Sequence, residues 1–274
     1  MKYAHQPKVA DADGVKLRHA ATVMILADRP ELEVLMVRRT SRAVFAPSAW
    51  VFPGGRVDPH DALAPDVSHV VHGLDDVAAS AALGVPNNGR AWWLAGLRET
   101  LEESGLLIGA GDAHADAVER IRTAVQDDAG ALVSALVEND VRLDLGELVD
   151  VGQFITPIGP PRRFDARFFV ALAPLDQNAS HDKEEVVEHR WVRPADAVTQ
   201  WRAGDFPIMS VTHRMLACLQ RYESSAAVMK VAQSRGPEQR VRVNDPDGEY
   251  EVLLPGEPGY ETAEVEIEHG WVRI

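Results

Sequence analysis

The chain has 274 residues, 46% of them hydrophobic, and a formal net charge of -14. This length and composition allow one main domain with additions around a substantial core. The negative charge argues against nucleic acid or an anionic membrane as a partner, so a phosphate-bearing substrate would have to be held locally by arginines or a bound metal.

Neither a membrane span nor a secretion signal is expected. No run of about 18 apolar residues occurs, and the stretch MKYAHQPKVADADGVK lacks the apolar middle of a signal peptide. We therefore expect a soluble, cytoplasmic protein. The single cysteine, Cys218, excludes an internal disulfide, and its apolar helical surroundings predict a buried core residue rather than a nucleophile.

The first predicted elements are two β-rich runs, HAATVMILAD and RPELEVLMVRR, whose turn at Asp28 to Pro30 is typical of a hairpin. A basic and aromatic loop then leads into a short strand in WVFPGG. From Asp61 to Gly89 the composition shifts to Ala, Asp, His, Pro and Asn without a clear period. We interpret that segment as an insertion.

A helical pattern follows from Arg90 to Gly105, and we expect the glycine to end the helix. Residues 115–139 predict one long or two short helices. The later pattern predicts strands in VGQFIT, ARFFVALA and VVEHRWV, a small helix from Pro194 and a helix in MSVTHRMLACLQRY.

The tail from Val241 alternates like strands joined by Asp-Gly and Pro-Gly turns. Such strands could extend the sheet, cover the site or pair two subunits, and the sequence leaves these three open. We predict a main domain over 1–222, with an insertion at about 62–90, and a β-rich extension over 223–274.

The helix from Arg90 carries an acidic face. Glu99, Glu102 and Glu103 stand at i, i+3 and i+4, which places them on one side. The other side carries Trp93, Leu94, Leu97 and Leu101. Repelling carboxylates need compensation, and oxygen ligands without cysteine suit Mg²⁺ or Mn²⁺ better than Zn²⁺. A solvated acidic face is the alternative, and spacing alone does not decide between them.

Two stretches, FPGGRVDPHD and RETLEESGLL, resemble the two halves of the signature of the Nudix hydrolase family. Gly55 is followed, after five residues, by the acid Asp61, where the family usually has glutamate. The family's box allows seven residues between that acid and the arginine. Here residues 62–97 separate them, 36 residues in all, so 29 are additional. Thr100 also occupies a usually apolar place.

A box split in this way resembles the acyl-coenzyme A diphosphatase branch, as do RRTSRAVFAPSAWVFPGG and FITPIGPPRRFDARFFVALAP. The resemblance covers roughly residues 20–222 and implies an α/β fold, an α/β/α sandwich with a mixed sheet. It implies a Mg²⁺- or Mn²⁺-dependent hydrolase that cleaves the diphosphate of CoA or acyl-CoA. The coenzyme A signature of another Nudix branch is not met, since Val44 and Ser48 stand at its fixed places. Hydrolysis of ADP-ribose, a nucleotide sugar or a dinucleotide, and a non-catalytic nucleotide sensor, remain alternatives.

The resemblance also implies roles for individual residues. Metal ligands would be Glu99, Glu102, Glu103 and the Gly54 carbonyl, with Arg98 orienting the acids. Glu185, ahead of Glu184, would be a further ligand or the base that activates water, unless both acids simply face solvent. For substrate binding we predict Arg39, Arg42, Phe45, Arg56 and Arg163, because arginine grips phosphate bidentately and an aromatic ring can hold a base or acyl portion. A homodimer is an open alternative.

One inference concerns the helix surface beside the acids. Ala95 and Gly96 stand one turn before them, so we expect a flat side that lets a diphosphate approach the metal. Trp92 falls on that side too, and packing under the insertion is preferred over stacking on a base.

Overall fold

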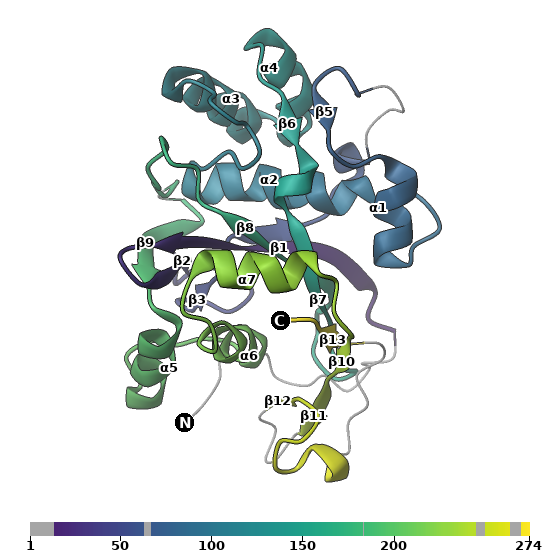
Figure 1. Ribbon diagram of the computed structural model, residues 1–274, viewed down its shortest axis with the longest axis vertical. Coiled ribbons are helices and arrows are strands. Elements are labelled where there is room, and N and C mark those ends of the chain that lie inside the picture. The colour runs from purple at the N-terminus through teal and green to yellow at the C-terminus, as the bar shows by residue number, and fades with distance from the viewer. Residues whose placement is uncertain (1–13, 63–66, 183, 245–249, 264–269) are drawn as a thin grey trace.

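The computed structural model describes residues 14–62, 67–182, 184–244, 250–263 and 270–274 (Figure 1). It is the α/β/α sandwich expected from the resemblance, with a nine-stranded mixed sheet between two layers of helices. The sheet order is β10-β13-β7-β8-β1-β2-β3, with β4 beside β1 and β9 beside β2. The strands are β1 Leu17–Asp28, β2 Leu32–Arg39, β3 Trp50–Val51, β4 Gly54–Arg56, β7 Val149–Ile155, β8 Arg163–Leu172, β9 Val186–Val192, β10 Gln239–Arg240 and β13 Trp271–Val272.

The predicted hairpin forms the centre of the sheet. Strands β1 and β2 pair antiparallel, with Leu26 opposite Val34, and β8 runs parallel to β1. Successive side chains of a strand point to opposite faces. Ala21, Val23 and Ile25 therefore join the core above the sheet in Figure 1, whereas Met24 and Leu26 join the core below it.

Helices cover both faces. Above the sheet lie α1 Asp76–Leu83, α2 Arg90–Ser104, α3 Ala115–Asp127 and α4 Leu132–Glu138, and below it lie α5 Pro194–Ala203, α6 Ser210–Leu219 and α7 Ser225–Gln233. Short 3₁₀ turns span Pro59–Asp61, Ala129–Ala131, Leu145–Glu147 and Tyr260–Thr262. In the described part of the chain, no helix is long and apolar enough to cross a membrane.

Helix α2 ends as predicted at Gly105, whose φ of 70° is the left-handed conformation that favours glycine. Its leucines are buried against the sheet, as expected. The prediction of a flat, open side next to the acids is wrong, however. A Cβ at Gly96 would lie 3.1 Å from Val23 Cγ2, so the glycine brings α2 close to β1 rather than opening the site.

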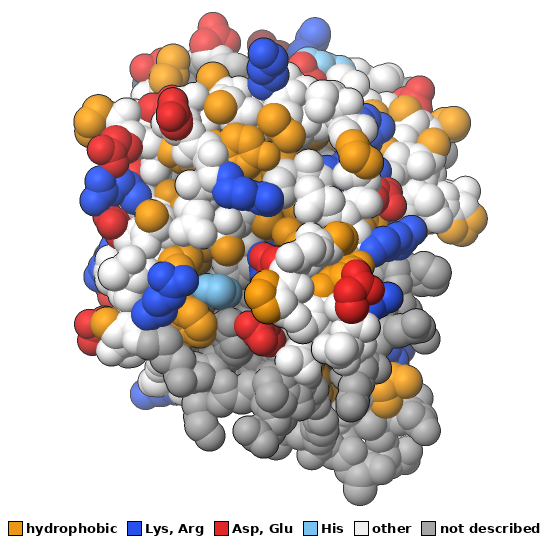
Figure 2. Space-filling view, turned by 60° about the horizontal axis from the view of Figure 1, so that its bottom comes forward, with side chains coloured by type: hydrophobic (Ala, Val, Ile, Leu, Met, Phe, Trp, Pro, Cys, Tyr) orange, Lys and Arg blue, Asp and Glu red, His pale blue; other side chains and the backbone are white. Residues whose placement is uncertain are grey.

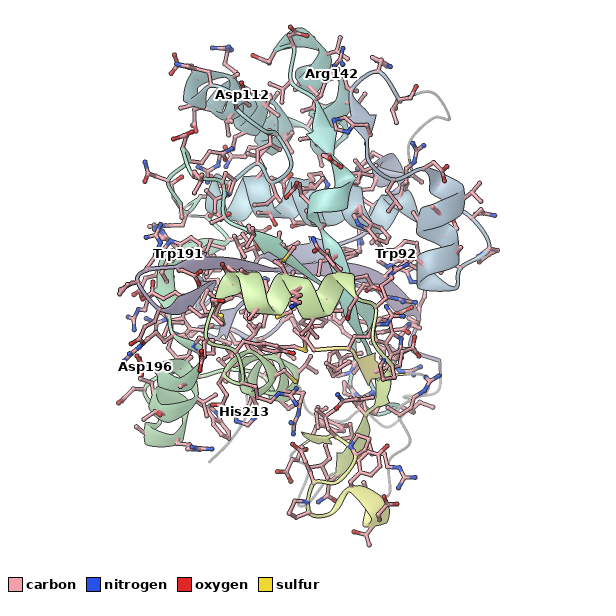
Figure 3. The ribbon with its side chains drawn as sticks, viewed as in Figure 1. Trp92, Asp112, Arg142, Trp191, Asp196 and His213 are labelled. Atoms are coloured by element: carbon pink, nitrogen blue, oxygen red, sulfur yellow. The ribbon has the colours of Figure 1, made fainter. Side chains whose placement is uncertain are left out.

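The insertion packs over the start of α2. The strand and the helix of the insertion were not visible in the sequence pattern. Strand β5 Val71–His72 pairs with β6 Leu143–Asp144, which lies outside the insertion, and α1 follows at Asp76. The Asp76 carboxylate accepts the amides of Asn88 and Arg90, which ties the insertion to the first turn of α2. Trp92 is buried there beside α1 (Figure 3), as preferred. Its ring and the His19 ring form a T-shaped contact with a centroid distance of 4.9 Å.

The C-terminal segment begins with α7, which the sequence pattern did not predict. Strands β10 and β13 then extend the main sheet beside β7, and β11 Arg242–Asn244 pairs with β12 Glu251–Leu253 in a separate hairpin. The Asp247-Gly248 turn and the strand expected around 264–269 lie outside the described residues, as does the N-terminal stretch 1–13. The boundary at 222 and the pairing of two subunits stay predictions. Cys218 is buried in the lower core, as expected.

Candidate active site

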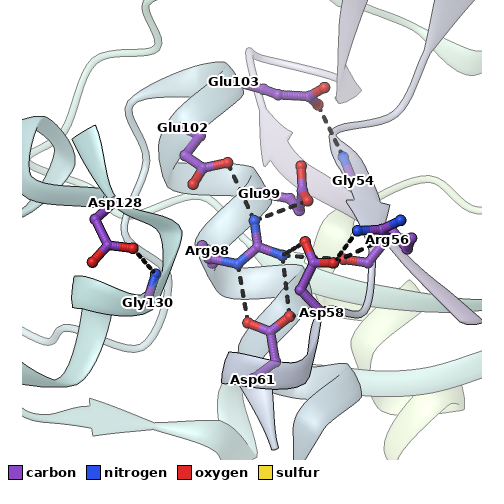
Figure 4. Close-up of polar contacts among 10 residues, drawn as sticks. All are labelled: Gly54, Arg56, Asp58, Asp61, Arg98, Glu99, Glu102, Glu103, Asp128 and Gly130. Carbon is purple, nitrogen blue, oxygen red and sulfur yellow. Dashed lines mark hydrogen bonds and ion pairs between the residues drawn. The ribbon is translucent and has the colours of Figure 1, made fainter. Parts of the chain in front are cut away.

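The two halves of the split box meet at Arg98. This side chain is 2% exposed, and its Nε and Nη2 donate to the two carboxylate oxygens of Asp61 at 3.0 and 3.1 Å. Nη2 also donates to the Arg56 carbonyl at 3.1 Å (Figure 4). The insertion therefore loops out and returns, so that residues 37 positions apart form a forked ion pair.

Arg98 also contacts the acidic face of α2. Its Nη1 donates to Glu99 Oε1 at 2.9 Å and to Glu102 Oε2 at 3.3 Å. Burial alone would lower the pKa of Arg98, but the hydrogen bond to Asp61 and the charges of Glu99 and Glu102 raise it above its ordinary value. The guanidinium thus stays charged and fixes two of the three predicted ligands beside the first half of the box.

The third acid is fixed by the backbone of β4. Gly54 N donates to Glu103 Oε2 at 3.0 Å, so the Gly54 amide contacts the acid cluster. The metal role of the Gly54 carbonyl stays a prediction. Gly54 has φ 149°, and a Cβ there would lie 2.3 Å from the Ala21 carbonyl oxygen. Only glycine fits that position.

Gly55 makes room for Glu99. A Cβ at Gly55 would lie 2.4 to 2.5 Å from the Glu99 carboxylate, closer than atoms can approach. We expect Gly55→Ala to push this carboxylate aside and to lower kcat at least about tenfold, or about 1.4 kcal/mol of barrier, with a small change in Tm. Gly236→Ala is the matched control, because no atom of the described residues lies within 4 Å of its Cβ position. Wild-type kcat for Gly55→Ala would refute this packing.

Burial makes the acid cluster hard to ionise without a cation. It raises the pKa of Glu99 to about 7, opposed by the charge of Arg98 and reinforced by that of Glu102. Burial and the charge of Glu99 hold the pKa of Glu103 well above its ordinary range. Burial also raises the pKa of Glu102. The acidic face is therefore not the solvated one that the alternative reading required.

Glu185 reaches the same cluster from a distant loop. It lines the pocket that contains Glu99 and Glu103, and its charge contributes to the raised pKa of both Glu102 and Glu103. The Asp182 carboxylate accepts the Glu185 amide at 3.0 Å, while the Glu185 carbonyl accepts the Thr40 amide at 2.9 Å. These bonds fix the loop. Glu184, the second candidate, and Glu185 are both exposed, but only Glu185 lines the pocket.

The pocket has a volume of about 510 Å³ and lies below the sheet, against the even-numbered residues of β1 and β8. Of the five predicted substrate residues, Arg39, Phe45 and Arg56 line it. Arg39 donates to the Phe45 carbonyl at 3.1 Å, and the Phe45 ring contacts Phe164 with a centroid distance of 5.1 Å. Seen from below in Figure 2, hydrophobic side chains lie between positive and negative ones on this side of the molecule.

Arg42 and Arg163 are not brought into this pocket. Arg42 is exposed in the loop after β2, and Arg163 donates instead to the Thr156 carbonyl at 3.0 Å. Odd-numbered residues of β8, such as Phe169, face the upper core, whereas Phe164 and Phe168 face the pocket. A shift of one residue therefore separates Arg163 from its neighbour Arg162, which does line the pocket.

Four further polar residues belong to this site, and sequence reasoning missed two of them, Arg18 and Asp58. Arg18 and Arg162 line the pocket, Asp61 grips Arg98, and Asp58 pairs with the Arg56 guanidinium. The box motif itself signalled Asp61. The two arginines carry no motif, because the parallel pairing of β1 with β8 brings them together from positions 144 residues apart.

The donor set fits a divalent cation. One oxygen of each carboxylate, Glu99, Glu102 and Glu103, accepts a hydrogen bond from Arg98 or from the Gly54 amide. Burial disfavours the charge of these carboxylates unless a cation compensates it. Within the described residues, no three acids, histidines or cysteines already gather their donor atoms around one point. The carboxylates would therefore have to turn toward an ion as it binds.

Comparisons with known proteins agree with this geometry. The family model described as NUDT19 Nudix domain matches residues 75–212, half of the chain. The acyl-coenzyme A diphosphatase NUDT19 of Gallus gallus is 27% identical over 89% of this chain and 81% of its own length. A Caenorhabditis elegans protein named as a nudix hydrolase is 28% identical over 70% of this chain, which spans 56% of that protein's length. The crystal structure of a NUDIX hydrolase from Alicyclobacillus acidocaldarius has a TM-score of 0.64 at 27% identity, covering 79% of this chain and 97% of that one. The chain belongs to the Nudix hydrolase family.

Proposed function

We propose that the protein is a Mg²⁺- or Mn²⁺-dependent diphosphatase that hydrolyses the diphosphate linkage of CoA or, preferably, of acyl-CoA. The observation that carries this proposal is the pocket. It joins buried carboxylates and four arginines, Arg18, Arg39, Arg56 and Arg162, to a long apolar lining. A coenzyme A thioester has matching parts: phosphates for the arginines and metal, and an apolar arm for the lining. The similarity to a relative named acyl-coenzyme A diphosphatase supports the same substrate class.

The proposed mechanism assigns a task to each group. Glu99, Glu102 and Glu103 would hold the cation, which when bound neutralises phosphate charge and makes water a better nucleophile. Glu185 would take the proton from the attacking water, because it lies in the same pocket on a fixed loop. Arg98 keeps Glu99 and Glu102 aligned, while Arg39 and Arg56 would grip the phosphates.

A substrate screen tests the reaction class. Purified protein with Mg²⁺ or Mn²⁺ is incubated with CoA, acetyl-CoA, octanoyl-CoA, ADP-ribose, NADH and a nucleotide sugar, and products are identified by mass. We expect the acyl-CoAs to give an adenosine bisphosphate and an acylated phosphopantetheine with the highest kcat/KM. A preference for ADP-ribose, NADH or the sugar would replace the CoA assignment, and no turnover of any of them would favour a nucleotide sensor.

Metal binding should depend on pH. In the metal-free protein the pKa of the Glu99 carboxyl is about 7, above the value of 4.5 that it has in the unfolded chain. Its contribution to folding stability is therefore fully present below pH 4.5 and is lost as the pH rises through 7. A cation needs the ionised form, so we expect the Mg²⁺-induced rise in Tm to be larger at pH 8 than at pH 6. At a hundredfold excess over Kd the gain is about 2.7 kcal/mol. Thermal melts with and without Mg²⁺ measure it. An equal shift at both pH values would contradict the role of Glu99.

A further inference from the structure

The C-terminal segment forms one wall of the pocket. Val243 on β11 and Val252 on β12 are directly opposite each other in the hairpin, and both line the cavity. Met209 and Val211, at the start of α6, and Phe154 on β7 continue this lining. All five side chains are apolar, so this part of the cavity offers hydrophobic contact.

A buried arginine holds the hairpin in place. Arg214 on α6 donates from Nε and Nη2 to the Val252 carbonyl at 3.0 and 2.6 Å. Its two Nη atoms also donate to the two oxygens of Glu257, each at 2.7 Å. Glu257 Oε2 in turn accepts the Leu254 amide at 2.8 Å. Four hydrogen bonds thus tie the residues around Val252 to α6.

The pocket has two chemically different parts. Glu99 and Glu103 enter from α2, past Gly54 and Gly55, whereas the hairpin lies on the side of α6, away from α2 (Figure 1). A ligand that fills the cavity therefore carries its anionic group toward the acids and an apolar group toward Val252. Apolar groups gain about 0.8 kcal/mol per buried methylene, about fourfold in affinity, when they leave water.

We propose that the β11–β12 hairpin selects the substrate by its acyl group: Val243 and Val252 receive the acyl chain, and Arg214 is the residue that positions them. This inference rests on the proposed acyl-CoA diphosphatase function. It adds a determinant that lies outside the Nudix box and outside residues 75–212.

Substitution of Val252 tests the wall. We expect wild-type kcat/KM to increase along a series from acetyl-CoA to octanoyl-CoA. In Val252→Trp, which fills the cavity, the ratio of kcat/KM for octanoyl-CoA to that for acetyl-CoA should fall at least about tenfold. Glu251→Trp is the matched control, since it adds the same ring one residue away on the exposed face of β12, and its ratio should match wild type. An unchanged ratio in Val252→Trp would overturn the proposal, even if kcat/KM fell equally for both substrates.

Measurements of substrate binding test this inference independently of the proposed reaction. The Kd values of CoA and octanoyl-CoA are measured by calorimetry without metal. Tighter binding of octanoyl-CoA that Val252→Trp removes and Glu251→Trp retains would uphold the wall even if no CoA compound were hydrolysed. Equal Kd values for CoA and octanoyl-CoA in the wild type would overturn it, even if both were hydrolysed.

Arg214 variants test the positioning role. Arg214→Ala should raise KM for octanoyl-CoA at least about fivefold while kcat changes little, because Arg214 contacts the hairpin and Glu257 and not the acid cluster of α2. Arg214→Lys, which keeps one donor to the Val252 carbonyl, should recover part of that KM. A purely structural role would instead lower Tm without changing the ratio of the two Kd values, and that result would refute positioning.

Discussion

Glu103→Gln should lower kcat by about a thousandfold or more, a loss of about 4 kcal/mol in transition-state stabilisation, while the protein stays folded. Glu103 is almost fully buried, and its Oε2 accepts a hydrogen bond from Gly54 N. Glutamine keeps an oxygen that can accept this bond, so local packing survives. What it removes is the negative charge, which a divalent cation would need.

The same substitution should leave the metal-free protein at least as stable as wild type. Burial already holds the pKa of the Glu103 carboxyl well above its ordinary range, so its charge is unfavourable when no cation is present. The Mg²⁺-induced increase in Tm should disappear. Activity and metal response would thus fall while the metal-free Tm is maintained, a combination that a folding defect cannot produce.

A control and a second acid sharpen the experiment. Glu119→Gln changes an exposed glutamate on α3 and should retain both kcat and the Mg²⁺ response. Glu102→Gln should also lower kcat by orders of magnitude. Near-normal turnover in both Glu102→Gln and Glu103→Gln would refute the metal assignment for this face of α2.

How much of this could be read from the sequence depended on whether the signal was local. Helix α2 was predictable because leucines repeat at helical spacing on one face and Gly105 ends the pattern. The acids converge for the same reason. Helix α1 was missed because DVAASAAL has an alanine-rich composition without a marked apolar stripe, and its packing depends on the insertion around it.

Contacts between segments distant in the sequence were harder to predict. The flat surface expected at Gly96 failed because a helical wheel shows which residues share a side, but not which side the sheet covers. The prediction that Arg163 binds substrate failed because the register of β8 sets which face of the sheet each residue takes, and a single-residue shift exchanges the two faces. The hairpin wall at Val252 depends on Arg214, 38 residues earlier, and no local pattern connects them.

The second large effect is expected at Arg98. Arg98→Met should lower the free energy of unfolding by about 3 to 5 kcal/mol, because Asp61, which is as buried as the arginine, loses its cationic partner. For a chain of this size that corresponds to at least about 6 °C in Tm. Catalytic activity should be lost as well, since Glu99 and Glu102 lose the group that aligns them. Thermal melts and kcat measure the two effects.

A double substitution distinguishes an ion pair from simple packing. In Arg98→Met with Asp61→Leu, no buried charge of the pair is left uncompensated, so stability should recover in part, whereas activity should stay lost because the acids remain unaligned. Arg193→Met, which removes an exposed arginine paired with Asp196 and Glu31, should change Tm little and serves as the control. If Arg98→Met melted at the wild-type temperature, the ion pair would not join the two halves of the box. If the double variant regained turnover, Arg98 would be structural alone, and the alignment of Glu99 and Glu102 would have to come from another group.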